Sequence, residues 1–396
     1  MWSFQQTTDF LFNSFYTNGG LKDIRLMREG FAAKDPVQPI GVGVAMVFEA
    51  WLMGTAADIF GDVPYSKAVQ DTIPSPVPFD TQVDIYNHVI ALLDSAVANL
   101  AGGGQFSGVD LAYPGSSPDV VAAAYTAVAH TLKARFLMHN SKSPGVDANA
   151  NYQAALLETA SGITSPAGNY FAKHDGTAGS YNLTWGSIGN GGDRNSDTGT
   201  PGAMIEGMKA RGDTLLLALY FTPVDSAGKS TYVGTDITSR PSIPGVSAFS
   251  NFAMNGATPT PLITYAENQL IAAEAQFRLG QQAAALATLN AVRATYFERP
   301  LSVSGNQILQ EVLFEKYVQA FLTPEPYFDY NRTCWPNLRM PPDRQQNFIP
   351  GRLFVGTTEA STNPTTPPQG DHNANNPKNT VSLDGSQCVG QVGRSG

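Results

Sequence analysis

The fold is decided by the stretch LITYAENQLIAAEAQFRLG, which runs from Leu262 to Gly280. Its apolar residues recur every three or four positions, the spacing that places them on one face of an α-helix. Gly280 is well suited to end that helix, and a second apolar face of the same period continues to Tyr296. The stretch therefore predicts two helices, Leu262–Gly280 and Gln281–Glu298, which pack antiparallel because their connection is short.

A similar pair of periodic segments occurs earlier, at Val121–His139 and Asn151–Ile163. Each unit has the helix–turn–helix layout of a tetratricopeptide repeat, which spans about 34 residues. Two loose copies predict a mostly α fold, in which tetratricopeptide-like helix pairs form an α-solenoid core. A loop-rich face would hold the ligand, with a few short strands.

The chain divides into four regions that we expect to form one domain, residues 1–396. Residues 1–165 show helical periodicity, and residues 166–260 form an insertion of glycine clusters and polar loops. Residues 262–322 hold the helix pair and a following helix. Residues 323–396 are rich in Pro and Asn and predict C-terminal loops and a tail.

Composition excludes several classes of protein. With 42% hydrophobic residues the chain is globular, and its formal net charge of −9 argues against a nucleic-acid partner. The opening residues MWSFQQ lack the features of a signal peptide. The apolar stretch from Gly41 to Phe60 contains two acidic residues, and it predicts a buried helix better than a membrane span. The two cysteines, Cys334 and Cys388, would either form one bridge or remain as two thiols.

Several motifs in series carry a resemblance to a known family. They are IFGDVPYSKA (59–68), TYAENQLIAAEA (264–275), LNAVR (289–293), EKY (315–317), YFDYNRT (327–333) and IPGRLFV (349–355). In this order they resemble the SusD/RagB-like family of outer-membrane nutrient-binding lipoproteins.

The resemblance implies a non-catalytic receptor without a cofactor. Such a receptor binds an oligosaccharide or a similar small nutrient on the extracellular face of the outer membrane. It then delivers the nutrient to a TonB-dependent transporter of the SusC type. The lipid anchor that would attach it to the membrane is absent from this sequence, so the membrane location is an expectation from the resemblance alone.

Two other functions remain open at this stage. A glycoside hydrolase on an α/α scaffold would need two carboxylates across a cleft, a pairing that sequence does not reveal. A tetratricopeptide-type interaction scaffold would bind protein segments. Glu274 and Arg278 are four residues apart, so an ordinary helical ion pair explains them better than catalysis does.

The candidate ligand-binding residues are aromatic side chains in polar context. Sugar rings present apolar C–H faces and hydroxyl rims, so a site for them needs flat aromatic platforms with amide and guanidinium partners. The predicted set is Trp185, Trp335, Tyr181, Tyr327, Arg194, Asn195 and Asn337, with Tyr65 and Tyr113 in second rank. The alternative is that these rings anchor long loops to the helical body.

One short segment resembles a metal site. Asp193, Asn195 and Asp197 match the first three side-chain ligands of a calcium-binding EF-hand loop. The later positions do not match, since Thr198 stands where the glycine belongs and Met204 where the glutamate belongs. A polar loop therefore explains the segment better, and calcium is a weak candidate.

Overall fold

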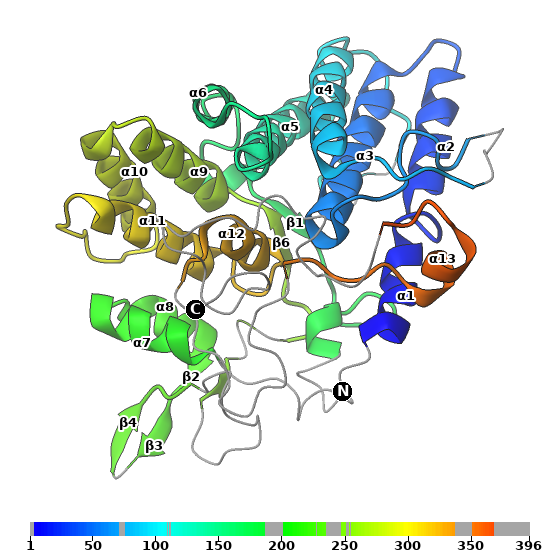
Figure 1. Ribbon diagram of the computed structural model, residues 1–396. Coiled ribbons are helices and arrows are strands. Elements are labelled where there is room, and N and C mark those ends of the chain that lie inside the picture. Colours follow the sequence, from blue (N-terminus) through cyan, green and yellow to red (C-terminus); the bar gives the residue numbers. More distant parts are fainter. Residues whose placement is uncertain are drawn as a thin grey trace. The chain divides into compact units, whose positions relative to one another are not determined.

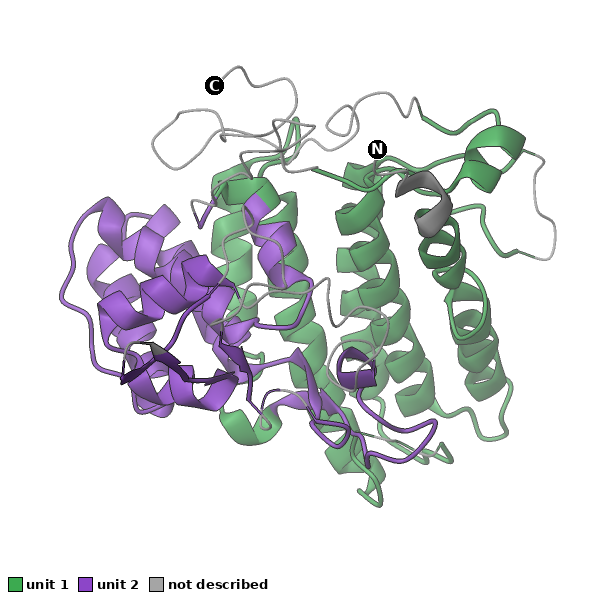
Figure 2. Cartoon of the chain, turned by 90° about the horizontal axis from the view of Figure 1, so that it is seen from below, with its two compact units in different colours: residues 1–168, 331–334, 347–396 green, residues 169–330, 335–346 purple. Residues whose placement is uncertain are grey.

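The computed structural model describes residues 4–70, 76–108, 110, 112–186, 201–226, 228–234, 247–250, 253, 255–336 and 351–367. Within them helices predominate and the strands are short (Figure 1). The mostly α fold with tetratricopeptide-like helix pairs is confirmed. The chain divides into two compact units, coloured separately in Figure 2. The prediction of a single domain stays a prediction.

Unit 1 comprises residues 1–168, 331–334 and 347–396. Its helices are α1 (Phe4–Ser14), α2 (Leu21–Ala32), α3 (Pro39–Phe60), α4 (Gln82–Leu100), α5 (Pro118–Asn140), α6 (Ala148–Thr159) and α13 (Thr357–Thr362). Helix α3 packs against α2, α4 and α5, which places it at the centre of the unit. It is the one described helix long and apolar enough to cross a membrane, but most of its apolar stretch is buried inside the protein.

Sequence signals at the helix starts explain where these elements begin. The Thr81 hydroxyl accepts a hydrogen bond from the Asp84 N–H (3.2 Å), and Asp147 caps α6 through the Asn149 N–H (2.9 Å). Helices α3 and α5 both start at a proline, which lacks the N–H that the first turn would leave unpaired.

Unit 2 comprises residues 169–330 and 335–346. Its helices are α7 (Gly202–Arg211), α8 (Thr214–Tyr220), α9 (Tyr265–Arg278), α10 (Gln282–Thr295) and α11 (Asn306–Gln319), together with most of α12 (Glu325–Thr333). Helices α9 and α10 pack together and α11 packs on both, as Figure 1 shows. Leu270, Leu289 and Val312 meet in their common core. The predicted antiparallel helix pair is therefore confirmed.

The strands among the described residues of unit 2 form three small antiparallel pairs. They are β1 (Tyr170–Ala172) with β6 (Thr260–Ile263), β2 (Phe221–Thr222) with β5 (Ala248–Phe249), and β3 (Val224–Ser226) with β4 (Lys229–Thr231). The first pair brings the start of the insertion beside the entry to α9.

Two regions contain more helix than the sequence analysis predicted. The insertion holds α7 and α8, and α7 buries only the short apolar set Met204, Ile205 and Met208. Gly212 ends α7 in the left-handed conformation (φ 75°), which a glycine adopts without strain. Beyond residue 323, α12 forms where loops were expected. Its second residue is Pro326, and proline is well tolerated in a first helical turn.

Candidate functional site

A cavity of about 540 Å³ lies within unit 2, a size typical of pockets for small ligands. It is lined by residues of β1, β6, the ends of α8, α10 and α11, and the loops near residues 182 and 255. Four aromatic side chains, Phe171, Tyr220, Tyr296 and Phe321, contribute to its walls. Alanine, leucine and proline line it together with several Asn, Thr and Gln residues, and the surface exposed to the cavity is mainly apolar.

The buried Asn182 ties the two lining loops together. Its Nδ2 group donates to the Thr258 carbonyl (2.9 Å) and to the Thr260 hydroxyl (3.1 Å), while its backbone N–H donates to the Gly256 carbonyl (2.8 Å). These bonds use both side-chain donors of one amide to hold residues 256–260. Hydrogen bonds therefore hold this part of the cavity lining together.

The entry to α9 forms another part of the cavity lining. The Thr264 hydroxyl accepts from the Glu267 N–H (3.2 Å), which is a helix N-cap. Asn169 Oδ1 accepts from the Tyr265 N–H (2.7 Å), so β1 is tied to the first turn of the helix. Both capping residues also line the cavity.

The aromatic wall is part of a larger packed cluster. The rings of Tyr220 and Phe321 lie 5.0 Å apart between centroids, and Phe321 also meets Phe221 (5.5 Å) and Phe249 (5.7 Å). Such aromatic pairs contribute stability beyond the area they bury. The wall is held in place by neighbouring rings.

Three polar groups at the cavity have unused hydrogen-bonding capacity within the described residues. The hydroxyls of Tyr220 and Tyr296 have no hydrogen-bond partner there, and neither does Gln319 Oε1. The Gln319 Nε2 group donates to Glu315 (2.9 Å), which fixes the orientation of the side-chain amide. Burial raises the pKa of Tyr296 to about 12, and it also raises the pKa of Tyr220. Both phenols are therefore neutral at physiological pH.

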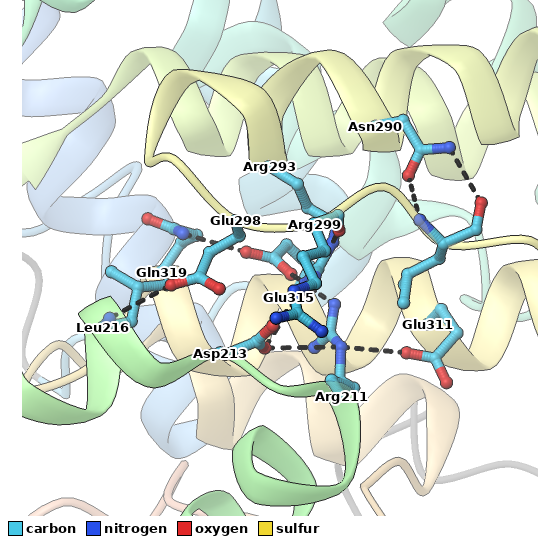
Figure 3. Close-up of polar contacts among 11 residues, drawn as sticks. Arg211, Asp213, Leu216, Asn290, Arg293, Glu298, Arg299, Glu311, Glu315 and Gln319 are labelled. Carbon is cyan, nitrogen blue, oxygen red and sulfur yellow. Dashed lines mark hydrogen bonds and ion pairs between the residues drawn. The ribbon is translucent and has the colours of Figure 1, made fainter.

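A buried ionic cluster holds Glu315 in place (Figure 3). Arg293 donates to Asp213 (2.6 Å) and to Glu315 (2.9 Å), and Arg211 adds a further bond to Glu315. Burial lowers the pKa of Arg293, but its bonds to the two carboxylates outweigh this and leave the pKa above its ordinary value. The cluster joins α10 and α11 to the turn between α7 and α8, beneath the cavity residue Gln319.

Two of the predicted ligand residues, Tyr181 and Trp185, lie beside the cavity, because their neighbours Asn182 and Thr184 line it, although neither ring is itself part of the lining. The Tyr181 and Trp185 rings lie 5.9 Å apart in an edge-to-face arrangement, and both are half-buried. The Trp185 ring lies against Gly256, where a side chain would come within 3.1 Å of the ring. The Trp185 N–H donates to Asn182 Oδ1 (3.0 Å). We call Tyr181 and Trp185 the rim pair.

The other described candidates lie elsewhere. Tyr327 and Trp335 are half-buried and do not line the cavity. Tyr65 and Tyr113 belong to unit 1. Only 1% of Tyr65 is exposed, and its hydroxyl donates to Glu49 (3.3 Å), while Tyr113 packs on Tyr125. Tyr65 therefore has a structural role in unit 1.

Arg194, Asn195 and Asn337 lie outside the described residues, as do the calcium candidates Asp193 and Asp197. Within the part of the chain that is described, no three His, Cys, Asp or Glu side chains are grouped to hold a metal ion. Cys334 is disulfide-bonded, and Cys388 lies outside the described residues. The ion pair of Glu274 with Arg278 is confirmed (3.3 Å), and Glu274 also pairs with Lys316.

Sequence analysis missed the cavity residues Tyr220, Tyr296, Gln319 and Phe321. Tyr220 is the last residue of α8, Tyr296 follows α10 directly, and Phe321 stands two residues after α11. An aromatic residue at the carboxyl end of a helix is the signal that the three share. In the sequence alone, such an aromatic residue looks the same as a residue of the hydrophobic core. The helix that precedes it has the same spacing of apolar residues in both cases.

A family model described as "Starch-binding associating with outer membrane" matches residues 2–354. Among solved structures, one named a chitin-binding protein is 22% identical with a TM-score of 0.72, covering 90% of this chain and 82% of its own. A SusD/RagB family protein from Bacteroides thetaiotaomicron is 21% identical (TM-score 0.67; coverage 94% and 86%). A chitin-binding SusD homolog from Flavobacterium johnsoniae is 17% identical (TM-score 0.70; coverage 86% and 80%). These likenesses show the fold. No protein with a curated description matches the chain.

Proposed function

The chain belongs to the SusD-like family, and we propose that it captures an oligosaccharide or similar nutrient at the outer face of the outer membrane. It then delivers this nutrient to a TonB-dependent transporter of the SusC type. The family's description names starch binding and the outer membrane, and two structural neighbours are named as chitin-binding proteins. Polysaccharide fragments are therefore the first class of ligand to test for binding.

The observation that carries the proposal is the rim pair beside the cavity. An indole and a phenol ring offer apolar faces to the C–H groups of a sugar, and the buried Asn182 holds the Trp185 backbone in position. A preformed aromatic surface beside a cavity is suited to capture, because little needs to be reorganised when the ligand binds.

The lining of the cavity favours binding over hydrolysis. A glycoside hydrolase needs an acid and a second carboxylate on either side of the scissile bond. No Asp or Glu is among the described residues that line the cavity, and Glu315 behind it is held by Arg293 and Arg211. These carboxylate contacts favour a structural role for Glu315.

The first test is the variant Trp185→Ala, assayed by calorimetry against a panel of starch, chitin and xylan oligosaccharides. Loss of the ring should weaken binding of the preferred glycan by about 1–3 kcal/mol, as for other truncated binding aromatics. Leu183→Ala is the matched control, since Leu183 lies two residues away with 75% of its surface exposed. Equal affinity of the two variants, both folded, would contradict the role of the rim pair. Binding of no glycan by the parent chain would contradict the function.

The transporter step has its own test. The protein should co-purify with a large β-barrel transporter from the detergent-solubilised outer membrane of the native host. Recovery of the protein without any such transporter, under conditions that preserve other outer-membrane complexes, would argue against delivery.

A further inference from the structure

The chemistry of the cavity differs from that of a site for a bare sugar. Its walls are mainly aromatic and aliphatic, whereas a pyranose ring carries a hydroxyl on most of its carbons. Each hydroxyl that loses its bound water without gaining a hydrogen-bond partner weakens binding. A whole sugar residue placed inside would leave several hydroxyls against Phe171, Phe321 and Leu219.

Most polar side chains at the cavity already have partners. Asn182 binds Thr258 and Thr260, and the Thr264 hydroxyl accepts from the first turn of α9. The groups with capacity to spare include the two phenol hydroxyls and Gln319 Oε1. A few isolated hydrogen-bonding groups among apolar walls suit a ligand that is itself mostly apolar, with one or two polar substituents.

The walls also favour a flat and uncharged group. The tilted Tyr220 and Phe321 rings offer faces and edges on which a further ring can pack. None of the described lining residues is a Lys, Arg, His, Asp or Glu. A charged group would lose its hydration here without meeting an opposite charge.

We propose that this cavity holds an uncharged aromatic group that the captured glycan carries, either as an aromatic ester or as an aryl aglycone. The inference rests on the proposed function, because the sugar itself lies on the rim pair, Tyr181 and Trp185. The loop from residue 182 to 185 joins the two surfaces, since Asn182 lines the cavity and caps the turn that presents Trp185. One ligand therefore contacts both surfaces.

The test uses the full chain and four probes. Methyl ferulate represents the ester, phenyl β-glucoside represents the aglycone, methyl β-glucoside represents the sugar alone, and free ferulate carries the charge that the cavity should reject. We expect saturable, one-to-one binding of methyl ferulate or phenyl β-glucoside by calorimetry, at least tenfold tighter than either remaining probe. The probe that binds more tightly identifies ester or aglycone as the source.

Two variants locate the bound ring. Ala257 is exposed and lines the cavity. A tryptophan in its place (Ala257→Trp) should block entry and weaken the binding of the aromatic probe at least tenfold. Ala283→Trp, on the exposed side of α10 and away from the cavity, is the matched control. Tyr220→Phe removes only a hydroxyl and should weaken the binding of methyl ferulate severalfold without affecting folding.

The outcomes separate this inference from the function on which it rests. If glycans bind in the panel but the aromatic probes bind no better than methyl β-glucoside, the inference is overturned and the function stands. Unchanged affinity of the aromatic probes for a folded Ala257→Trp variant also overturns it. If methyl ferulate binds but no glycan does, the proposed function fails, and with it the assignment of the aromatic group to a glycan.

Discussion

At the scale of single residues, Arg293 illustrates how charge is kept inside unit 2. Its side chain is fully buried, and its guanidinium bonds two carboxylates and the Arg299 carbonyl (2.8 Å). A buried ion without such partners would be prohibitively unstable. The arrangement explains why the LNAVR segment of α10 contains an arginine at a position that faces the core.

We predict that Arg293→Met destabilises the protein by about 3–5 kcal/mol, because it leaves Asp213 and Glu315 as buried charges with one partner fewer. Guanidinium denaturation followed by circular dichroism measures the change. Lys209→Met breaks an exposed pair with Glu206 and should cost no more than about 1 kcal/mol. Similar losses of unfolding free energy in the two variants would show that the buried cluster contributes no more stability than an exposed ion pair.

At the scale of elements, close approach between helices depends on small residues. A methyl group added at Gly54 of α3 would lie 2.2 Å from the Phe136 ring of α5, and one at Gly43 would lie 2.7 Å from Leu100 of α4. The space that a side chain would occupy at each glycine is filled by rings and methyl groups from the neighbouring helix. This is how α3 packs against several helices along most of its length.

We expect Gly54→Ala to lower stability by about 1–3 kcal/mol through overpacking against Phe136. Gly30→Ala on α2 is the matched control, since nothing lies within 4 Å of the added methyl group. That change should stabilise the helix by up to about 1 kcal/mol, because alanine favours helix over glycine. Melting temperatures that shift in the same direction for both variants would contradict this account of α3.

The contact between α5 and α6 has a pH dependence that can be worked out. Burial raises the pKa of the Glu158 carboxyl, but hydrogen bonds from His130 and Lys133 outweigh it, and the net pKa is lowered. A lowered carboxyl pKa contributes stability that is present above the unfolded value of 4.5 and is lost as pH falls through the folded value.

Glu158→Gln should therefore be less stable than the parent chain at pH 7, and the difference should shrink as the pH falls below about 4.5. Urea denaturation at a series of pH values measures it. Glu206→Gln, on the exposed face of α7, serves as the control and should show little of this dependence. A stability difference that is constant from pH 7 to pH 3 would contradict the assignment.

At the scale of the whole molecule, a protein that captures a nutrient needs a site that binds its ligand without catalysing a reaction. The chain belongs to a family of binding proteins, and the cavity of unit 2 is lined by groups that neither donate nor accept a proton near neutral pH. Buried ionisable groups of this unit lie instead in the cluster around Arg293 and Glu315 and in the pairs of Glu274 with Arg278 and Lys316. Charge stabilises the packing of helices, while the candidate site stays neutral.

We therefore predict no release of reducing sugar when the purified chain is incubated with the oligosaccharide that it binds most tightly. Product would be measured by a reducing-end assay over many hours, with the Trp185→Ala variant as the weakly binding comparison. Steady release by the parent chain that stops on replacement of one Asp or Glu would show that the protein is an enzyme.

The sequence by itself determined the helical class, the α9–α10 pair and the family, because these depend on local periodicity and on short motifs read in order. It also singled out Tyr181 and Trp185 as candidate ligand residues, since large aromatic residues between polar neighbours stand out, and their role in binding stays a prediction. It did not identify Tyr327 as part of a helix, because the prolines nearby suggested a loop.

Only the tertiary structure decided which residues form the cavity. Its lining comes from segments between Asn169 and Leu322, and each segment by itself resembles ordinary core or loop sequence. Tyr220, Tyr296 and Phe321 meet because α8, α10 and α11 end in the same place, an arrangement fixed by the buried bonds of Arg293 and by the β1–β6 pairing. Contacts between residues far apart in the chain create the site, and no local pattern encodes them.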